Sequence, residues 1–372
     1  MKRKHFTSCL VLLTALTILL TGCGTGSSAG SKANTKEKVS FDNVPKRFAK
    51  GQGAKIKVIR KIGGDDHTAQ FLAGTKAEGE ALGFTVDVYT ANGDTAKFHD
   101  AISQALEENY DGFIISHGDD EATVADVKKI TAKGIPVVAF DSNPKLKDIK
   151  GVTVTSQDDE QLAKKSLDAL VSDFKGKANI AYLWVDGFPP MVRRNKVYQE
   201  TLKQHSGIKE LDRFGIASSD TSVQTQNAVA AMLNKYPKGK LDAIFATWDA
   251  FAIGAARALK EAGRTEVKIY GIDVSNADLQ EMTAKDSPWK YTAAVDPKLI
   301  GAVDVRILAK KIAGEKTPSS YDLEASLISQ KQLQQAGKAI NMVNLADEVK
   351  GFGSSTAFEE DWMKTLKKHY TK

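Results

Sequence analysis

The chain has 372 residues and a formal net charge of +6 at neutral pH, and 42% of its residues are hydrophobic. This length is enough for two lobes with separate hydrophobic cores, and the composition excludes an intrinsically disordered chain. Lys2, Arg3 and Lys4 carry half of the excess positive charge, so the rest of the chain is too weakly basic to indicate a nucleic-acid-binding protein.

Residues 1–22 have the three parts of a secretory signal peptide: a basic start, an apolar run and small residues before a cysteine. The apolar run at 9–20 is short for a membrane span. The residues Leu20-Thr21-Gly22-Cys23 resemble a bacterial lipobox, which implies cleavage before Cys23 and lipid attachment to its thiol. Cleavage would also remove Cys9, which leaves no disulfide and no cysteine metal site. The alternative is an ordinary signal peptide followed by a chance cysteine.

Residues 23–54 are rich in glycine, serine, lysine and threonine and poor in large apolar side chains. A segment of this composition buries too little apolar surface to fold, so it is predicted to be a flexible tether after the lipidated cysteine. Together, the leader and the tether predict a protein that is lipid-anchored at the outer face of the plasma membrane.

From residue 55 onward, short apolar segments alternate with segments of helical periodicity. Strands are predicted at 56–60, 84–89, 112–116, 136–140, 151–155, 179–185, 241–246, 267–272 and 291–295. Helices are predicted at 67–82, 95–108, 121–133, 158–174, 192–204, 222–234, 250–262 and 299–313. Apolar strands that alternate with helices are typical of parallel sheets buried on both faces, so the predicted fold class is α/β, with two doubly wound halves in tandem.

The tail that begins near residue 327 has a different pattern. A short helix is predicted at 330–336, a loop of small residues at 351–356 and a terminal helix at 358–369. In the last of these, Phe358, Trp362 and Leu366 recur every four residues, which predicts one apolar face that docks on a lobe.

Four segments in this order resemble one family. They are Ile135-Pro-Val-Val-Ala-Phe-Asp141, Leu241–Asp249 with the helix after it, Val267-Lys-Ile-Tyr-Gly-Ile-Asp273, and Asp296-Pro297 followed by Ile300-Gly301. Between residues 55 and 325 the chain resembles the bacterial substrate-binding proteins for simple sugars, of the ribose-binding type in the periplasmic-binding-protein superfamily.

The resemblance implies two Rossmann-like lobes that are joined by three crossovers and close on a ligand like a clamshell. The crossovers are expected near Ser156-Gln157, Val295 and Ala325. Lobe one is then 55–155 plus 296–325, and lobe two is 156–295 together with 326–372 as a C-terminal tail.

Ligands of open parallel α/β sheets bind beyond the carboxyl ends of the strands, and the residues there are unusually polar in this chain. Carboxylates accept hydrogen bonds from paired hydroxyls, arginine donates to oxygens, and an aromatic ring covers the apolar face of a sugar. These residue types therefore predict a site for a polyhydroxylated ligand. The candidate residues are Asp65, Asp66, His67, His117, Asp141, Arg193, Arg194, Trp248, Asp249 and Asp273.

Some of these candidates have a second interpretation. Asp66 and Asp249 are also placed to cap the helices that follow them, and His67 and His117 are also ordinary loop histidines. Asp141 and Asp273 match ligand aspartates of the family. The sequence does not decide between Arg193 and Arg194 as the ligand contact.

The chain also departs from the ribose-type pattern. Asp65, Asp66 and His67 stand where the relatives place phenylalanines, Ser142 replaces an arginine, Trp248 an asparagine and Val295 a glutamine. The ligand is therefore not expected to be ribose. A different sugar, a polyol and a partly cationic solute remain open.

The predicted function is capture of a simple sugar or polyol by a monomeric protein that delivers it to the permease of an ABC importer. A sensory role at a membrane kinase or chemoreceptor needs the same clamshell and stays an alternative. A glycoside-acting exported enzyme is a remote one, because no nucleophile motif is present, and the leader argues against a transcription-factor effector domain. The cluster Asp65-Asp66-His67 lacks a second histidine for a metal, and no phosphate-binding glycine loop indicates a cofactor.

Overall fold

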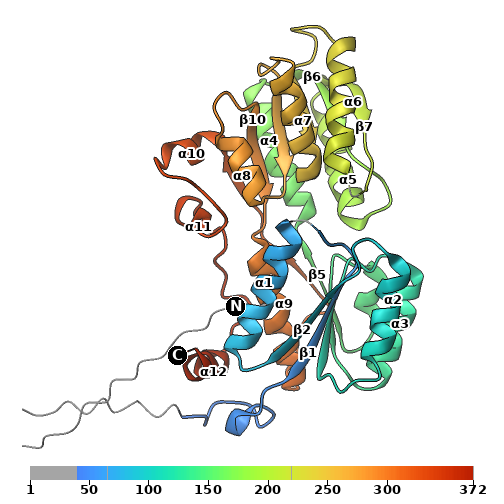
Figure 1. Cartoon of the computed structure of the whole chain (residues 1–372), viewed down its shortest axis with the longest axis vertical. Helices are drawn as coiled ribbons and strands as arrows, with labels where there is room; N and C mark the ends of the chain where they lie inside the picture. The colour runs from blue at the N-terminus through green and yellow to red at the C-terminus, as the bar shows by residue number, and fades with distance from the viewer. Residues whose placement is uncertain (1–39, 65, 219, 372) are drawn as a thin grey trace, which may run out of the picture. The chain divides into compact units, whose positions relative to one another are not determined.

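The computed structural model describes residues 40–64, 66–218 and 220–371. They form two α/β lobes, each around a six-stranded sheet, which confirms the predicted fold class (Figure 1). The predicted signal peptide and Cys23 lie outside the described residues.

The sheet of lobe one is parallel throughout, with the strand order β11-β5-β4-β3-β1-β2. Its strands are β1 Lys55–Arg60, β2 Thr85–Thr90, β3 Gly112–Ser116, β4 Val137–Phe140, β5 Val152–Gln157 and β11 Ser320–Leu323. The inner strands β3 and β4 are buried along their whole length, as their continuous apolar sequences require of strands covered on both faces.

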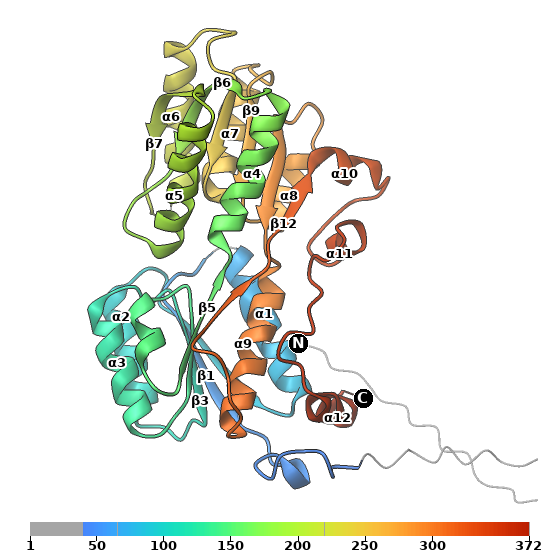
Figure 2. The same ribbon diagram turned by 180° about the vertical axis from the view of Figure 1, so that it is seen from behind.

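Helices cover both faces of this sheet, as Figures 1 and 2 show from opposite sides. One face carries α1 Asp66–Ala81 and α9 Pro297–Ile312, and the other carries α2 Thr95–Ala105 and α3 Glu121–Ala132. Glycine lets α1 and α9 pack closely, because a Cβ on Gly74 would lie 2.1 Å from the carbonyl oxygen of Lys298. Two short 3-10 helices, η1 Ala49–Gly51 and η2 Pro144–Asp148, complete the lobe.

The sheet of lobe two has the order β12-β10-β9-β8-β6-β7, and only β12 runs antiparallel to its neighbour. Its strands are β6 Lys177–Leu183, β7 Gly207–Phe214, β8 Ala243–Ala246, β9 Lys268–Ile272, β10 Trp289–Ala294 and β12 Ser326–Ser329. One face packs on α4 Asp159–Asp173 and α5 Pro189–Gln204, and the other on α6 Thr221–Lys235, α7 Asp249–Glu261 and α8 Asn276–Thr283.

The chain passes between the two sheets after β5, after β10 and after β11. These passages lie at the positions expected for the three crossovers. They put the carboxyl ends of both sets of parallel strands beside the junction of the lobes (Figure 2).

The C-terminal tail is shared between the lobes. Helices α10 Gln330–Gln335 and α11 Leu345–Glu348 contribute Leu333 and Leu345 to the core of lobe two. Helix α12 Asp361–Tyr370 instead buries Trp362, Met363 and Leu366 in the core of lobe one. This differs from the sequence-based grouping of all of 326–372 with lobe two. Phe358 lies before the helix, at a φ of 58°.

The predicted tether also ends earlier than residue 54. Val44 and Phe48 are buried in the core of lobe one, and the ring of Phe48 stacks on that of Trp362 with centroids 5.4 Å apart. The spacing of these two apolar residues fits one docked face, which the overall polar composition of the segment concealed.

Candidate functional site

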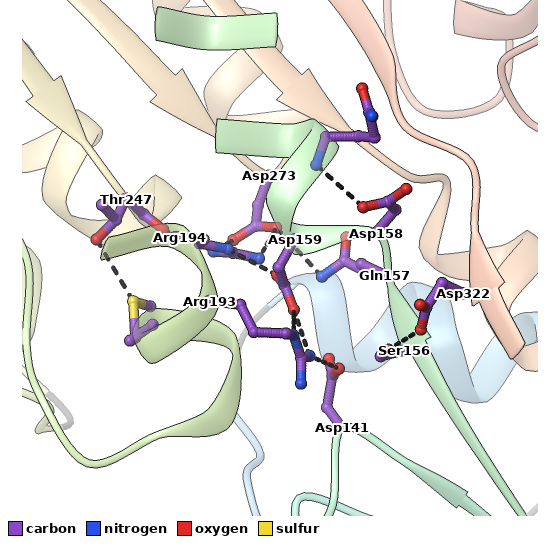
Figure 3. Close-up of polar contacts among 12 residues, drawn as sticks. Asp141, Ser156, Gln157, Asp158, Asp159, Arg193, Arg194, Thr247, Asp273 and Asp322 are labelled. Atoms are coloured by element: carbon purple, nitrogen blue, oxygen red, sulfur yellow. Dashed lines mark hydrogen bonds and ion pairs between the residues drawn. The ribbon is translucent and has the colours of Figure 1, made fainter. Parts of the chain in front are cut away.

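Two adjacent arginines of lobe two converge on one buried carboxylate (Figure 3). The Asp159 side chain, in the first turn of α4, has no exposed surface. Its Oδ2 accepts a hydrogen bond from Arg193 Nε at 2.9 Å and a second one from Arg193 Nη2, and its Oδ1 accepts from Arg194 Nε at 2.8 Å. Helix α5 positions both arginines, and Pro189 and Pro190 fix its start.

Arg194 continues this network to the ends of two strands. Its guanidinium donates to the carbonyl oxygen of Thr247 at 2.6 Å and to both oxygens of Asp273 at 3.2 and 3.3 Å. Burial disfavours its charge, but the carboxylates of Asp273 and Asp159 raise the pKa of Arg194 overall. This side chain is only 2% exposed. Arg194 is therefore a buried, permanently charged residue that links the ends of β8 and β9.

Arg193 reaches across to lobe one. Its Nη2 lies 3.5 Å from Asp141 Oδ1, and a third of its side chain is exposed. Asp141 follows β4 and is buried, and its Oδ1 has no hydrogen-bond partner among the described residues. Burial, followed by the charge of Asp159, raises the pKa of Asp141 well above its ordinary value. A buried carboxylate oxygen that lacks a hydrogen bond and lies beside an accessible guanidinium is a candidate contact for a hydrogen-bonding ligand.

Three of these strand-end residues have left-handed backbone conformations. The φ angles are 63° at His117, 44° at Asp141 and 75° at Asp273. Positive φ is uncommon outside glycine, and such residues concentrate at functional sites. Their common position directly after parallel strands supports the interpretation that these turns are shaped for binding.

The two histidines lie on the lobe-one side. His67 Nδ1 is 3.4 Å from Arg60 Nη2, and His117 Nδ1 is 2.8 Å from Ser116 Oγ. Burial and then the charge of Arg60 lower the pKa of His117 well below its ordinary value, so its imidazole is neutral at pH 7.

Asp66 forms a second contact between the lobes. Its Oδ2 accepts hydrogen bonds from the backbone N of Asn276 at 2.8 Å and from Asn276 Nδ2 at 3.1 Å. Asn276 begins α8 and in turn accepts at Oδ1 from the backbone N of Met342 in the tail. Asp66 therefore bridges the lobes at the surface.

The remaining candidates are placed differently. Asp65 lies outside the described residues. Trp248 is half-buried against the core of lobe two, edge-on to Phe251 at a centroid distance of 5.7 Å. Asp249 is the first residue of α7 and accepts a hydrogen bond from the adjacent backbone N of Ala250, whereas Trp248 is the N-cap residue and makes no side-chain capping hydrogen bond. The structure thus brings His67, His117, Asp141, Arg193, Arg194 and Asp273 toward one interlobe region.

The sequence analysis missed Asp159, Gln157 and Arg60. Asp159 resembles an ordinary acidic residue in a first helical turn, although it follows the first crossover directly. Gln157 Nε2 donates to Asp273 Oδ1 at 3.4 Å, and its own Oε1 has no hydrogen-bond partner among the described residues. A charged residue that closes the apolar strand β1 was the available signal for Arg60.

Residues 56–316 match the sequence family of the periplasmic binding protein domain. The chain belongs to the periplasmic binding protein family. This periplasmic binding protein is 24% identical over 260 residues to the ribose import binding protein of Salmonella typhimurium, covering 68% of this chain and 83% of the relative. It therefore belongs to the ribose-binding-like, type I branch that the sequence predicted.

Two solved structures are more similar. A sugar ABC transporter protein from Yersinia enterocolitica is 51% identical, with a TM-score of 0.82 over 88% of this chain and 98% of that one. A 5-methylthioribose transporter solute binding protein from Thermotoga lettingae, in complex with 5-methylthioribose, is 32% identical, with a TM-score of 0.80 over 87% of this chain and 99% of that one. Within the described residues, no helix of this binding protein is long and apolar enough to cross a membrane, and no group of three or more histidine, cysteine or acidic residues is arranged to hold a metal ion.

Proposed function

We propose that this protein captures a simple sugar or polyol between its two lobes and hands it to the permease of an ABC importer, without chemical change of the solute. The observation that carries this proposal is the polar constellation at the facing strand ends. It joins Asp141 of lobe one to Arg193 of lobe two and leaves a buried carboxylate oxygen without a hydrogen bond. The proposal is supported by the two similar structures, which are a sugar ABC transporter protein and a transporter solute binding protein.

The residues suit a hydroxyl-rich solute. Asp141 accepts hydrogen bonds from hydroxyl groups of the solute. Arg193, in the opposite lobe, donates hydrogen bonds to hydroxyl or ring oxygens. A solute that touches both lobes binds the closed arrangement better than an open one, so it shifts the equilibrium toward closure. The permease then recognises a surface composed of both lobes.

Two observations guide the choice of solutes to test. The chain departs from the ribose-type pattern at several candidate positions, and a similar structure is a complex with 5-methylthioribose. A pentose with a modified 5-position is therefore the first member to test. A thermal-shift screen of pentoses, their 5-substituted derivatives, hexoses and polyols would identify it, because a solute that binds only the folded state raises the melting temperature.

The role of the strand-end carboxylates is tested by titration calorimetry with the solute that the screen returns. Asp141→Asn and Asp273→Asn should each weaken binding at least tenfold, about 1.4 kcal/mol, because each change replaces an acceptor oxygen by an amide N–H donor in a desolvated site. Asp168→Asn, at an exposed carboxylate on α4, is the matched control and should bind like the wild type. Wild-type affinity in both site variants would rule out this site.

We also propose that the protein is a monomer that is lipid-anchored through Cys23 at the outer face of the plasma membrane. The support is the leader and the Leu20-Thr21-Gly22-Cys23 sequence. Metabolic labelling with a radioactive fatty acid should mark the wild type in the membrane fraction, and Cys23→Ser should abolish the label. A labelled Cys23→Ser variant would contradict the anchor.

A further inference from the structure

The C-terminal tail is docked on both lobes, and a short link separates the two docked parts. Phe352 is buried in the core of lobe two. From Ser355 onward the tail is held by lobe one, because Arg306 Nη1 on α9 donates to the carbonyl oxygen of Ser355 at 2.7 Å. The link between these two points is Gly353-Ser354. Figure 2 shows the tail running from α11 beside lobe two to α12 beside lobe one.

The lobe-one part of the tail is fixed by buried charges as well as by the apolar face of α12. Glu78 on α1 accepts a hydrogen bond from Arg306 Nε at 2.7 Å and pairs with Lys367 Nζ of α12 at 2.7 Å. Lys367 also donates to Glu359 at 2.6 Å. Glu78 and Arg306 are both buried. Release of the tail from lobe one would strand these charges, so the docked part is not a loose end.

The lobe-two part of the tail reaches the surface contact between the lobes. Met342 and Phe352 belong to the core of lobe two, and the backbone N of Met342 donates to Asn276 Oδ1 at 2.9 Å. The backbone N of Asn276 in turn donates to Asp66 Oδ2 of lobe one at 2.8 Å. The tail therefore holds the asparagine that contacts the opposite lobe.

The link passes beside the second crossover. Gly353 has a φ of 67°, and a Cβ at this position would lie 2.6 Å from Asp296 Oδ2. Asp296 is the N-cap of α9, the helix that follows this crossover. An extended chain spans at most about 3.6 Å per residue, so the chain from Phe352 to Ser355 reaches about 11 Å. The lobes cannot separate at this point beyond that reach unless one docked part of the tail is released.

We propose that the tail is a fourth connection between the lobes, and that its short link limits how far the solute-free protein opens. The three crossovers permit motion through changes in a few backbone dihedral angles, whereas the tail adds a segment whose two ends are both buried. Fewer open arrangements leave a larger population of nearly closed protein, which favours any solute that contacts both lobes. The proposal goes beyond solute capture and concerns the lobes themselves, whatever solute binds.

The backbone N–H of Asn276 reports separation of the lobes in solute-free protein. It lies in the first turn of α8, where N–H groups have no acceptor within their own helix, and its acceptor is Asp66 of lobe one. The backbone N–H of Asn179 donates to Asp242 Oδ2 at 2.7 Å within lobe two and is the internal reference. NMR of the full chain labelled with ¹⁵N-asparagine measures the exchange of both amides with water. Asp66→Ala gives the rate without the acceptor from lobe one.

The decisive variant lengthens the link and keeps both docked parts. Insertion of Gly-Ser-Gly-Ser between residues 354 and 355 should make the exchange of the Asn276 amide severalfold faster and leave that of Asn179 unchanged. The same insertion between residues 238 and 239, in an exposed turn of lobe two, is the control and should change neither rate. Wild-type exchange at Asn276 in the first variant would overturn the proposal. Equal acceleration at both amides would show general destabilisation and would overturn it as well.

A second variant tests the attachment to lobe one and serves if the insertion prevents folding. Arg306→Met removes the donor to the tail carbonyls, while Glu78 keeps Lys367 as its charged partner. The exchange at Asn276 should again become faster, by less than in the insertion variant. Lys367→Met is the matched control, because it removes the other partner of Glu78 and leaves those carbonyls bound. Equal acceleration in both variants would assign the effect to the ion pairs of Glu78 and refute the role of the link.

Discussion

The two lobes contribute polar residues to the interlobe site in different ways. In lobe two, Arg194 is bound by Asp159, Asp273 and the carbonyl of Thr247, so its charge is compensated before any solute arrives. In lobe one, Asp141 keeps an oxygen without a hydrogen bond, the imidazole of His117 is neutral because its pKa is lowered, and His67 lies 3.4 Å from the buried Arg60. We infer that the polar network of lobe two is formed before the solute binds, and that lobe one presents polar groups whose hydrogen bonds the solute supplies.

The largest effect is expected from removing the carboxylate of Asp159, which binds both arginines of the lobe-two network. Asp159→Asn leaves two arginines without their shared counter-charge, and one of them is buried. We expect the free energy of unfolding to fall by about 3 kcal/mol or more, since breaking a buried ion pair on one side strands the other charge. Urea denaturation with circular dichroism measures it, and the exposed Asp168→Asn should stay within about 0.5 kcal/mol of the wild type.

A similar loss of stability in Asp141→Asn would show that the strand-end carboxyl groups of both lobes stabilise the folded protein, and would remove the contrast between the lobes. The expected outcome is the reverse. The pKa of Asp141 is raised in the folded protein, so its ionised form destabilises the fold as the pH rises above the ordinary aspartate range. Asp141→Asn should therefore raise the melting temperature at pH 8 more than at pH 5.

Asp304, on α9 of lobe one, is a second buried carboxyl group whose pKa is raised. Its pKa is about 8 in the folded protein, against 3.8 for an ordinary aspartate, with burial as the main cause. A raised carboxyl pKa means that the folded state binds the extra proton, so the stabilisation that this group contributes is fully present below about pH 4 and is lost as the pH rises toward 8. The slope for one such group is roughly 1.4 kcal/mol per pH unit at most.

Asp304→Asn keeps an acceptor for Thr155 and removes the titration. We expect the variant to flatten the decline of the melting temperature between pH 5 and pH 8, and to be more stable than the wild type at pH 8. Parallel pH profiles for the two proteins would show that the pKa of Asp304 is not raised in the folded protein, and the contrast between the lobes would then be smaller than inferred.

Much of the architecture could be predicted from the sequence, because buried parallel strands are continuous apolar runs and helices separate them. Strand β7 could not, since it is an edge strand whose charged pairs Lys209-Glu210 and Asp212-Arg213 interrupt the apolar run. The docking of α12 on lobe one was also hidden. Its apolar face was readable, but the partner surface includes Phe48, more than 300 residues earlier.

The site was predicted through one rule, that polar residues after parallel strands converge. The rule selected Asp141 and Asp273 as candidates, and the structure gives both of them positive φ angles. It could not rank Asp249, whose hydrogen bond to its own helix is local, or detect Asp159, whose importance depends on arginines that fold back from α5. Which of two adjacent arginines crosses to the other lobe is likewise a property of helix orientation.

The smallest expected effect concerns the surface contact between the lobes. Asp66→Ala removes the acceptor for the two hydrogen bonds from Asn276, and both groups are solvent-accessible, so the loss should be about 1 kcal/mol or less. Because this contact exists only when the lobes are close, the loss should appear as a severalfold faster dissociation of the solute with little change in melting temperature of the solute-free protein. Asp100→Ala, at an exposed carboxylate on α2, is the control for surface charge. Stopped-flow dissociation measures the effect, and a variant whose affinity falls entirely through slower association would show that Asp66 guides the solute rather than holding the lobes together.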